Sequence, residues 1–152
     1  MSADAIDPTN PVGMYHYAHS YAASALALDN LNIKATHPDA PVRFLLSHSI
    51  ELFLKAHLLI KGVLLSRLSS REFGHNLEAL MRESIIQGLQ ISELHQQQIA
   101  FTDDALLDRY IQTGTRTILP SKALAGICKV LNAEVGKIVY LENGFARNPP
   151  SL

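Results

Sequence analysis

The sequence contains few of the residues that cross-link, charge or interrupt a chain. A single cysteine, Cys128, occurs among 152 residues, which excludes an internal disulfide and a four-cysteine zinc site. Lys and Arg total 13 against 14 for Asp and Glu, so no net positive field attracts nucleic acid, although a local basic patch is compatible with this balance. Eight glycines and seven prolines are far fewer than a low-complexity chain contains. One globular domain is therefore expected.

The chain also lacks an uninterrupted hydrophobic run. Its most apolar stretch, residues 44–65, contains histidines, lysines and a glutamate, and is too polar to span a membrane. Residues 1–11 carry two aspartates and lack the basic start and apolar run of a signal peptide. We therefore expect a cytoplasmic protein with no membrane association.

The positions of proline and glycine divide the chain into helical segments. No proline lies between residues 42 and 119, and helix starts favour proline whereas helix ends favour glycine. The apolar spacing then predicts helices at roughly 12–33, 41–61, 75–87, 92–113 and 120–141, with a short turn or ordered loop in 63–73. No region alternates polar and apolar residues for long enough to predict a strand. We expect an all-α, up-and-down bundle of four to five helices.

The two ends of the chain show none of this helical spacing. Residues 1–11 and the irregular tail 144–152 are both predicted to be disordered. The helical domain is therefore expected to occupy residues 12–143.

The second predicted helix carries a stripe of polar residues at intervals of four. These residues are Arg43, Ser47, Glu51 and Lys55, and His48 falls on the same side as Lys55. Glu51 precedes Lys55 in the order that favours an ion pair. The stripe is either the solvated face of an otherwise buried helix, or a polar groove or paired site at a dimer interface.

The third predicted helix begins at Gly74-His75-Asn76-Leu77. Asn76 is suited to capping this helix, and the His75 imidazole either bonds a neighbouring helix or faces a ligand. We expect Glu51 and Lys55 to lie within ion-pair distance and His75 to approach the second helix.

These motifs, in this order, resemble bacterial HEPN-domain proteins. Residues 43–62 read RFLLSHSIELFLKAHLLIKG and contain a Glu-x-x-x-Lys-Ala core, and residues 73–80 read FGHNLEAL with a Gly-His-x-Leu helix start. The later Leu107-Asp-Arg109-Tyr110 is similar to an Arg-Tyr segment that precedes the last long helix in many members. The resemblance covers about residues 12–141 and implies an α-helical up-and-down bundle that is frequently a dimer.

The resemblance also implies a range of functions. Active members of the superfamily are metal-independent ribonucleases or toxins, and inactive members bind RNA, nucleotides or protein partners. Activity rests on an Arg-x(4–6)-His motif in a late helix, but Gly114, Thr115 and Arg116 stand where the histidine would follow Arg109. We therefore expect a non-catalytic HEPN-like module that forms a homodimer and binds a protein partner, a nucleotide or RNA, in a setting such as a toxin–antitoxin or defence system.

A metal-independent ribonuclease with an atypical site is the alternative. Its Arg/His pair would be Arg43 with His48, or Arg109 with His75, the histidine acting as general base on a 2′-hydroxyl while the arginine stabilises the phosphorane. Arg43 and His48 have a suitable spacing, but residues five apart on a helix point about 140° apart. The candidate binding or polar-network residues are Arg43, Ser47, His48, Glu51, Lys55, His75, Asn76, Arg109 and Tyr110.

No metal or cofactor site is predicted. His16 and His19 are three residues apart, but no Asp, Glu or Cys stands close enough in sequence to complete a metal site. Cys128 lies on the apolar side of the last predicted helix, where a small hydrophobic residue is expected. The remaining cations either form a basic patch or are scattered solubilising charges: Arg67, Arg71, Arg109, Arg116 and Lys122.

Overall fold

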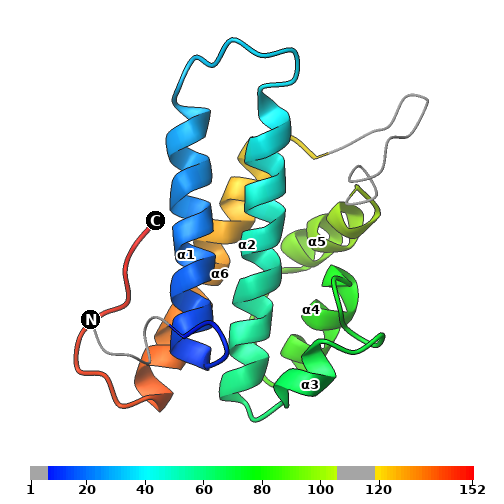
Figure 1. Ribbon diagram of the computed structural model, residues 1–152. Coiled ribbons are helices and arrows are strands. Elements are labelled where there is room, and N and C mark those ends of the chain that lie inside the picture. Colours follow the sequence, from blue (N-terminus) through cyan, green and yellow to red (C-terminus); the bar gives the residue numbers. More distant parts are fainter. Residues whose placement is uncertain (1–6, 106–118) are drawn as a thin grey trace.

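A computed structural model describes residues 7–105 and 119–152 of the chain, and every regular element in these residues is a helix (Figure 1). The helices are α1 (Pro11–Asp29), α2 (Asp39–Ile60), α3 (Leu65–Leu68), α4 (Leu77–Ile86), α5 (Glu93–Ala105) and α6 (Ser121–Glu142). The expected all-α class is confirmed, and α3 is the short turn expected between the second and third long segments. None of the helices described here is both long and apolar enough to cross a bilayer.

The helix ends follow local chemistry. The Asn10 side chain accepts a hydrogen bond from the Gly13 amide (2.8 Å) and caps α1, which Pro11 opens. Gly62 and Gly88 follow the last turns of α2 and α4 with φ of 91° and 99°, a conformation that glycine adopts without steric cost. α1 ends at Asp29, earlier than expected, because the apolar residues beyond it have nothing to pack against and residues 31–40 are all exposed.

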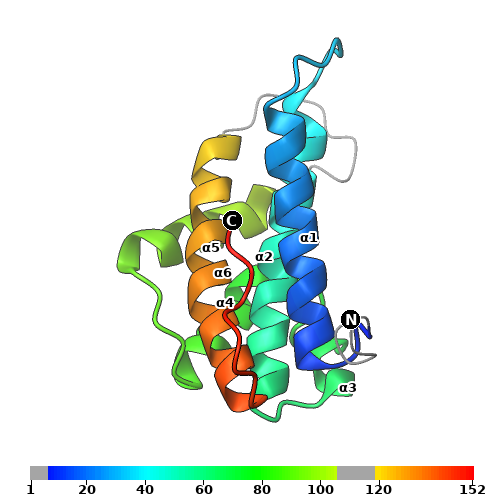
Figure 2. The same ribbon diagram turned by 90° about the vertical axis from the view of Figure 1, so that its left-hand side faces the viewer.

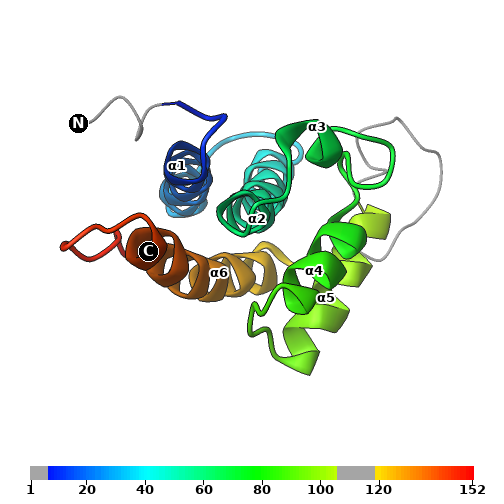
Figure 3. The same cartoon turned by 90° about the horizontal axis from the view of Figure 1, so that it is seen from below.

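Helix α2 lies at the centre of the fold. It contacts α1 along its length and also packs on α4 and α6 (Figure 3). Three alanines of α1 (Ala18, Ala22 and Ala25) are fully buried, and the Ser49 hydroxyl of α2 donates to the Ala18 carbonyl (2.7 Å). Small side chains on α1 therefore let the two helices approach closely.

The long helices do not simply alternate in direction along the chain. α1 and α2 run antiparallel, whereas α6 runs in the same direction as α2 (Figure 1). The shorter α4 and α5 lie to one side of α2 and α6 (Figure 3). The first and second helices thus form a hairpin that rests on α6.

Cys128 lies where α6 meets α2. It is 1% exposed, and its thiol donates to the Leu46 carbonyl (3.4 Å). Burial raises the pKa of the Cys128 thiol to about 12. The thiol is therefore protonated at neutral pH, as expected for a residue that serves as a small hydrophobic side chain.

The end segment, residues 145–152, has a defined path although the sequence predicts disorder. It runs back between α1 and α6 (Figure 2). The Asn132 amide donates to the Pro150 carbonyl (2.9 Å), and His19 Nε2 donates to the Ser151 carbonyl (2.8 Å). The acceptors are main-chain oxygens, which every residue type has, so no pattern of side chains in the sequence predicts these bonds.

Candidate functional site

The expected cluster of Glu51, Lys55 and His75 is present. Glu51 Oε1 lies 2.8 Å from His75 Nδ1, and Glu51 Oε2 lies 3.2 Å from Lys55 Nζ. Glu51 and Lys55 are one turn apart on α2, while His75 comes from the loop that leads into α4. The Glu51 carboxylate thus accepts from two donors, and the bond from His75 joins α2 to the loop that leads into α4.

Burial differs sharply within this cluster. The Glu51 side chain is 3% exposed, Lys55 is 13% exposed and His75 is 67% exposed. A buried carboxylate without partners would be strongly destabilising, and here both of its oxygens accept hydrogen bonds. His75 is therefore held by its Nδ1 on the inside, and the rest of its ring faces solvent.

This anchoring fixes the chemistry that His75 can offer. An imidazole whose Nδ1 donates to a carboxylate presents Nε2 as an acceptor when neutral and as a second donor when protonated. The outward nitrogen can therefore accept a proton, or can donate to an anion such as a phosphate.

Local structure at the start of α4 sets the position of His75. Asn76 accepts a hydrogen bond from the Ala79 amide (3.0 Å), which confirms the expected cap. Gly74 has a φ of 45°, which L side chains rarely adopt, and the Phe73 ring just before it is buried. A buried aromatic anchor, a glycine turn and a cap thus constrain the two positions before His75 and the one after it.

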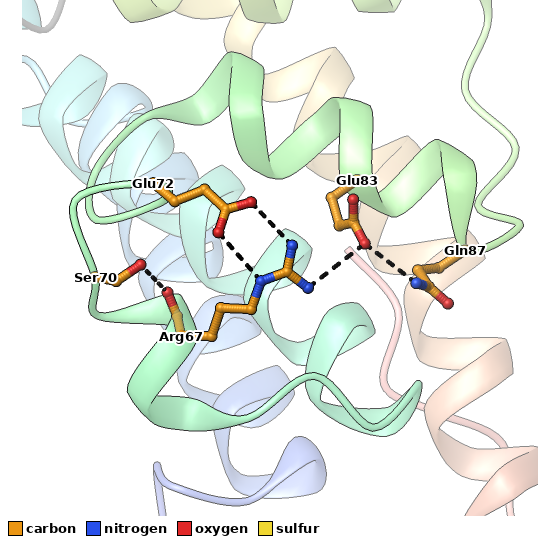
Figure 4. Close-up of polar contacts among 5 residues, drawn as sticks. All are labelled: Arg67, Ser70, Glu72, Glu83 and Gln87. Atoms are coloured by element: carbon orange, nitrogen blue, oxygen red, sulfur yellow. Dashed lines mark hydrogen bonds and ion pairs between the residues drawn. The ribbon is translucent and has the colours of Figure 1, made fainter.

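A surface network supports the same loop from α3 (Figure 4). The Arg67 guanidinium donates to both carboxylate oxygens of Glu72 (3.2 and 2.9 Å) and lies 3.9 Å from Glu83 of α4, which also accepts from Gln87 (3.2 Å). Arg67 also lies 5.0 Å above the Phe73 ring. Arg67 is therefore occupied with carboxylates and contributes to loop geometry rather than to a basic patch.

The other residues predicted on the α2 stripe do not all join the cluster. Ser47 is buried beside it, whereas Arg43 is half-buried and makes no ion pair with any residue in the described ranges. His48 packs against aromatic rings, with its centroid 4.7 Å from that of Tyr21 and 6.4 Å from that of Phe44. The described ring contacts of His48 are thus with Tyr21 of α1 and Phe44 of α2.

Several further predictions concern other parts of the chain. Arg109, Tyr110 and Arg116 lie outside the described residues. His16 and His19 have separate partners, since His16 Nε2 lies 2.6 Å from the Tyr140 hydroxyl and His19 bonds Ser151. No group of three His, Cys, Asp or Glu within residues 7–105 and 119–152 is arranged to hold a metal ion.

Sequence reasoning missed the environment of a second histidine on α2. His57 is 0% exposed, and neither of its ring nitrogens has a hydrogen-bond partner among the described residues. Burial lowers the pKa of His57 to about 4, Lys61 lowers it further, and Glu142 acts in the opposite direction. In the sequence His57 looks like one of several isolated histidines, so nothing in the pattern marks it.

Comparisons with family models, with curated proteins and with solved structures found no match for this chain. The arrangement of Glu51, Lys55 and His75 is therefore the feature from which a function can be inferred. The cluster consists of a buried carboxylate whose charge Lys55 offsets, a partly exposed ammonium group and an exposed imidazole.

Proposed function

We propose that the protein is a non-catalytic, HEPN-like helical module that binds a phosphate-bearing ligand, a nucleotide or a segment of RNA, beside His75. The observation that carries this proposal is the anchoring of the exposed His75 ring on the buried Glu51 carboxylate. A ligand that meets a ring already fixed in place does not have to order it, which reduces the entropic cost of binding.

The charge around the site favours an anionic ligand. Lys55 balances Glu51, so the carboxylate adds no net negative charge to the cluster. Arg43 lies two turns earlier on α2 and adds a cation that is not neutralised by any described residue. His75 Nε2 faces solvent, where it can donate to a phosphate oxygen through a charge-assisted bond.

The homodimer and a cytoplasmic role in a toxin–antitoxin or defence setting belong to the same proposal. They rest on the resemblance of residues 43–62 and 73–80 to HEPN-domain proteins. Light scattering coupled to size exclusion, read with absorbance at 260 nm, measures the oligomeric state and detects nucleic acid that co-purifies. A monomer free of nucleic acid would contradict the dimer and direct attention to a protein partner.

A metal-independent ribonuclease is the second candidate, favoured by one specific observation. The carboxylate on Nδ1 is the arrangement that orients a histidine and fixes its tautomer, as a general base requires. The catalytic arginine would have to approach His75 from elsewhere, and Arg109 is the sequence candidate. Cleavage of RNA in EDTA that is lost in both His75→Ala and Arg109→Ala would establish this alternative.

Binding of a fluorescein-labelled single-stranded RNA, followed by polarisation, tests the main proposal. We expect His75→Ala to weaken binding by tenfold or more, because the phosphate donor is removed. His95→Ala is the matched control, since His95 is a partly exposed histidine on α5 with its own partner, Ser92. Equal affinities for the wild type and the His75 variant, or no binding by the wild type, would contradict the proposal.

A further inference from the structure

The end segment rests on a face that α1 and α6 build together (Figure 2). Tyr15 and His19 are one turn apart on α1, and Asn132 and Gly136 are one turn apart on α6. These four residues, which we call the α1–α6 face, all lie against residues 149–151. The face therefore meets the segment at successive positions along both helices.

The α1–α6 face is held by contacts that do not involve the end segment. Tyr15 is 0% exposed and Asn132 is 4% exposed, and the Tyr15 hydroxyl donates to Asn132 Oδ1 (2.7 Å). The Tyr15 ring also packs against those of Phe53 and Tyr140, with centroids 5.7 and 5.8 Å apart. Because the hydroxyl holds Oδ1, the amide nitrogen of Asn132 is directed at the Pro150 carbonyl. The helices thus present a donor that is already oriented.

The donors of this face bind main-chain oxygens of the segment. Asn132 Nδ2 donates to the carbonyl of Pro150 (2.9 Å), and His19 Nε2 donates to that of Ser151 (2.8 Å). A proline offers a carbonyl acceptor but has no N–H group that would need an acceptor in return. Its fixed φ also reduces the entropy that an extended segment loses on binding. The face is therefore complementary to a proline-containing segment.

Apolar contacts on either side of these bonds define which residues fit. The missing side chain of Gly136 leaves room for Pro149, because a Cβ at this position would lie 3.1 Å from the Pro149 Cβ. Ser151 is exposed, whereas Leu152 is half-buried and packs against the hydrophobic core. The segment that fits thus has two prolines, then a residue of any type, then a large apolar residue.

The end segment itself lies at the surface, although the face beneath it is buried. None of residues 145–152 is buried. Segments held at the surface by few contacts open at a much lower free energy than core helices. A second segment of the same chemistry can therefore take the place of residues 149–152 without disturbing the helices.

We propose that the α1–α6 face binds a partner protein through a Pro-Pro-x-Leu segment, and that residues 149–152 occupy this face when the partner is absent. The carbonyls of the partner then accept the same bonds from Asn132 and His19 that the end segment accepts in the free chain. The proposal is independent of the phosphate site beside His75, so each can fail without the other.

A labelled peptide tests the exchange. A fluorescein-labelled peptide with the sequence of residues 145–152 is titrated with the full chain, either wild type or carrying both Pro149→Gly and Pro150→Gly. We expect the glycine form to bind the peptide about tenfold more tightly, because its own segment no longer competes at a high effective concentration. Adding His19→Ala to the glycine form should remove most of this gain. His37→Ala, which changes an exposed histidine outside the face, is the matched control and should leave the gain intact.

NMR of the isotope-labelled wild-type chain gives a measurement that does not depend on how the variants fold. With unlabelled peptide in excess, the backbone amide signals of residues 145–152 should shift as this segment leaves the face. The side-chain amide signal of Asn132 should stay in place, because its nitrogen then donates to a peptide carbonyl of the same kind.

Three results would overturn the proposal. Unchanged signals for residues 145–152, or a glycine form that binds the peptide no better than the wild type, would show that the end segment is a permanent part of the fold. A scrambled peptide that binds equally well would show that the face does not select this pattern. A wild-type dimer that becomes monomeric in the glycine form would show that a second copy, and not a different protein, supplies the segment.

Discussion

Two histidines, one within α2 and one bonded to it, lie in opposite environments. His75 is mostly exposed and its Nδ1 is bonded to a buried carboxylate, whereas His57 is completely buried and neither nitrogen has a partner in the described chain. The Glu51 carboxylate and water both lie beside the His75 ring. A proton on His57 finds neither, so this residue is a neutral core side chain.

The comparison shows that histidine content alone does not locate a site. His75 combines exposure with a fixed ring, which is what ligand binding requires. His57 combines burial with unpaired nitrogens, which makes the lower end of α2 sensitive to acid.

The largest expected effect is a loss of stability in acid caused by His57. The unfolded chain takes up this proton near the ordinary pKa of 6.5, but the folded chain takes it up only near pH 4. The contribution of neutral, buried His57 to the free energy of unfolding is therefore fully present above pH 6.5. It is lost as the pH falls toward 4, and the loss amounts to about 3 kcal/mol. Urea unfolding between pH 4 and pH 7 measures it.

A His57→Leu variant is the control for this pH dependence. It removes the titrating group and keeps an apolar side chain of moderate size, so its free energy of unfolding should vary much less between pH 4 and pH 6.5. An unchanged pH profile in this variant would show that other groups govern the acid sensitivity.

The next largest effect is expected from Glu51→Gln. This change removes the buried negative charge that Lys55 and His75 share, at a cost of about 2 kcal/mol in the free energy of unfolding. The His75 ring should lose its fixed orientation because its charged acceptor is lost. Thermal unfolding and NMR spectra of the His75 ring measure the two changes; ring signals identical to those of the wild type would show that the bond does not persist in solution.

Two smaller effects, opposite in sign, are expected on the pKa of His57. Lys61 and Glu142 form an ion pair (2.6 Å) at the end of α2, and they act on His57 with opposite signs. Lys61→Ala should raise the pKa of His57 and Glu142→Gln should lower it, while the lost ion pair itself costs no more than about 0.5 kcal/mol. The pH midpoints of the acid transition should move in opposite directions, and shifts of the same sign would contradict this electrostatic account.

The smallest effect is expected from the network behind His75. Arg67→Ala removes the bonds to Glu72 and the ion pair with Glu83 (Figure 4), but Arg67 and Glu72 are well exposed and solvent screens their interaction. Stability should therefore change less than in Glu51→Gln. Amide hydrogen exchange should become faster in residues 69–76, and unchanged exchange there would exclude a role for Arg67 in holding the loop.

Much of this arrangement could be predicted from the sequence, and the rest depends on contacts between distant segments. The Glu51–Lys55 pair lies within one helix, so its spacing alone predicts it, and the Gly-His-Asn-Leu pattern predicts the cap at Asn76. The partners of Arg67 and the solvation of His57 depend on how α3, α4 and α6 pack on α2. The spacing of residues within one helix does not predict contacts between helices.

The end segment gives the clearest case. Residues 145–152 have no helical spacing, and the sequence alone predicts disorder for them. Their order comes from Asn132 and His19, which bind main-chain oxygens, and from the absence of a side chain at Gly136. A Cβ there would lie 2.5 Å from the Tyr15 hydroxyl and 3.1 Å from Pro149.

That segment also ties the first helix to residues more than 130 positions later, since the Tyr15 hydroxyl lies 3.4 Å from the Pro150 carbonyl. Closing so long a loop has an entropic cost that only a nearly complete fold can offset. The contact is therefore expected to form late in folding. Its formation would report that the whole chain, rather than the α1–α2 hairpin alone, has reached its final arrangement.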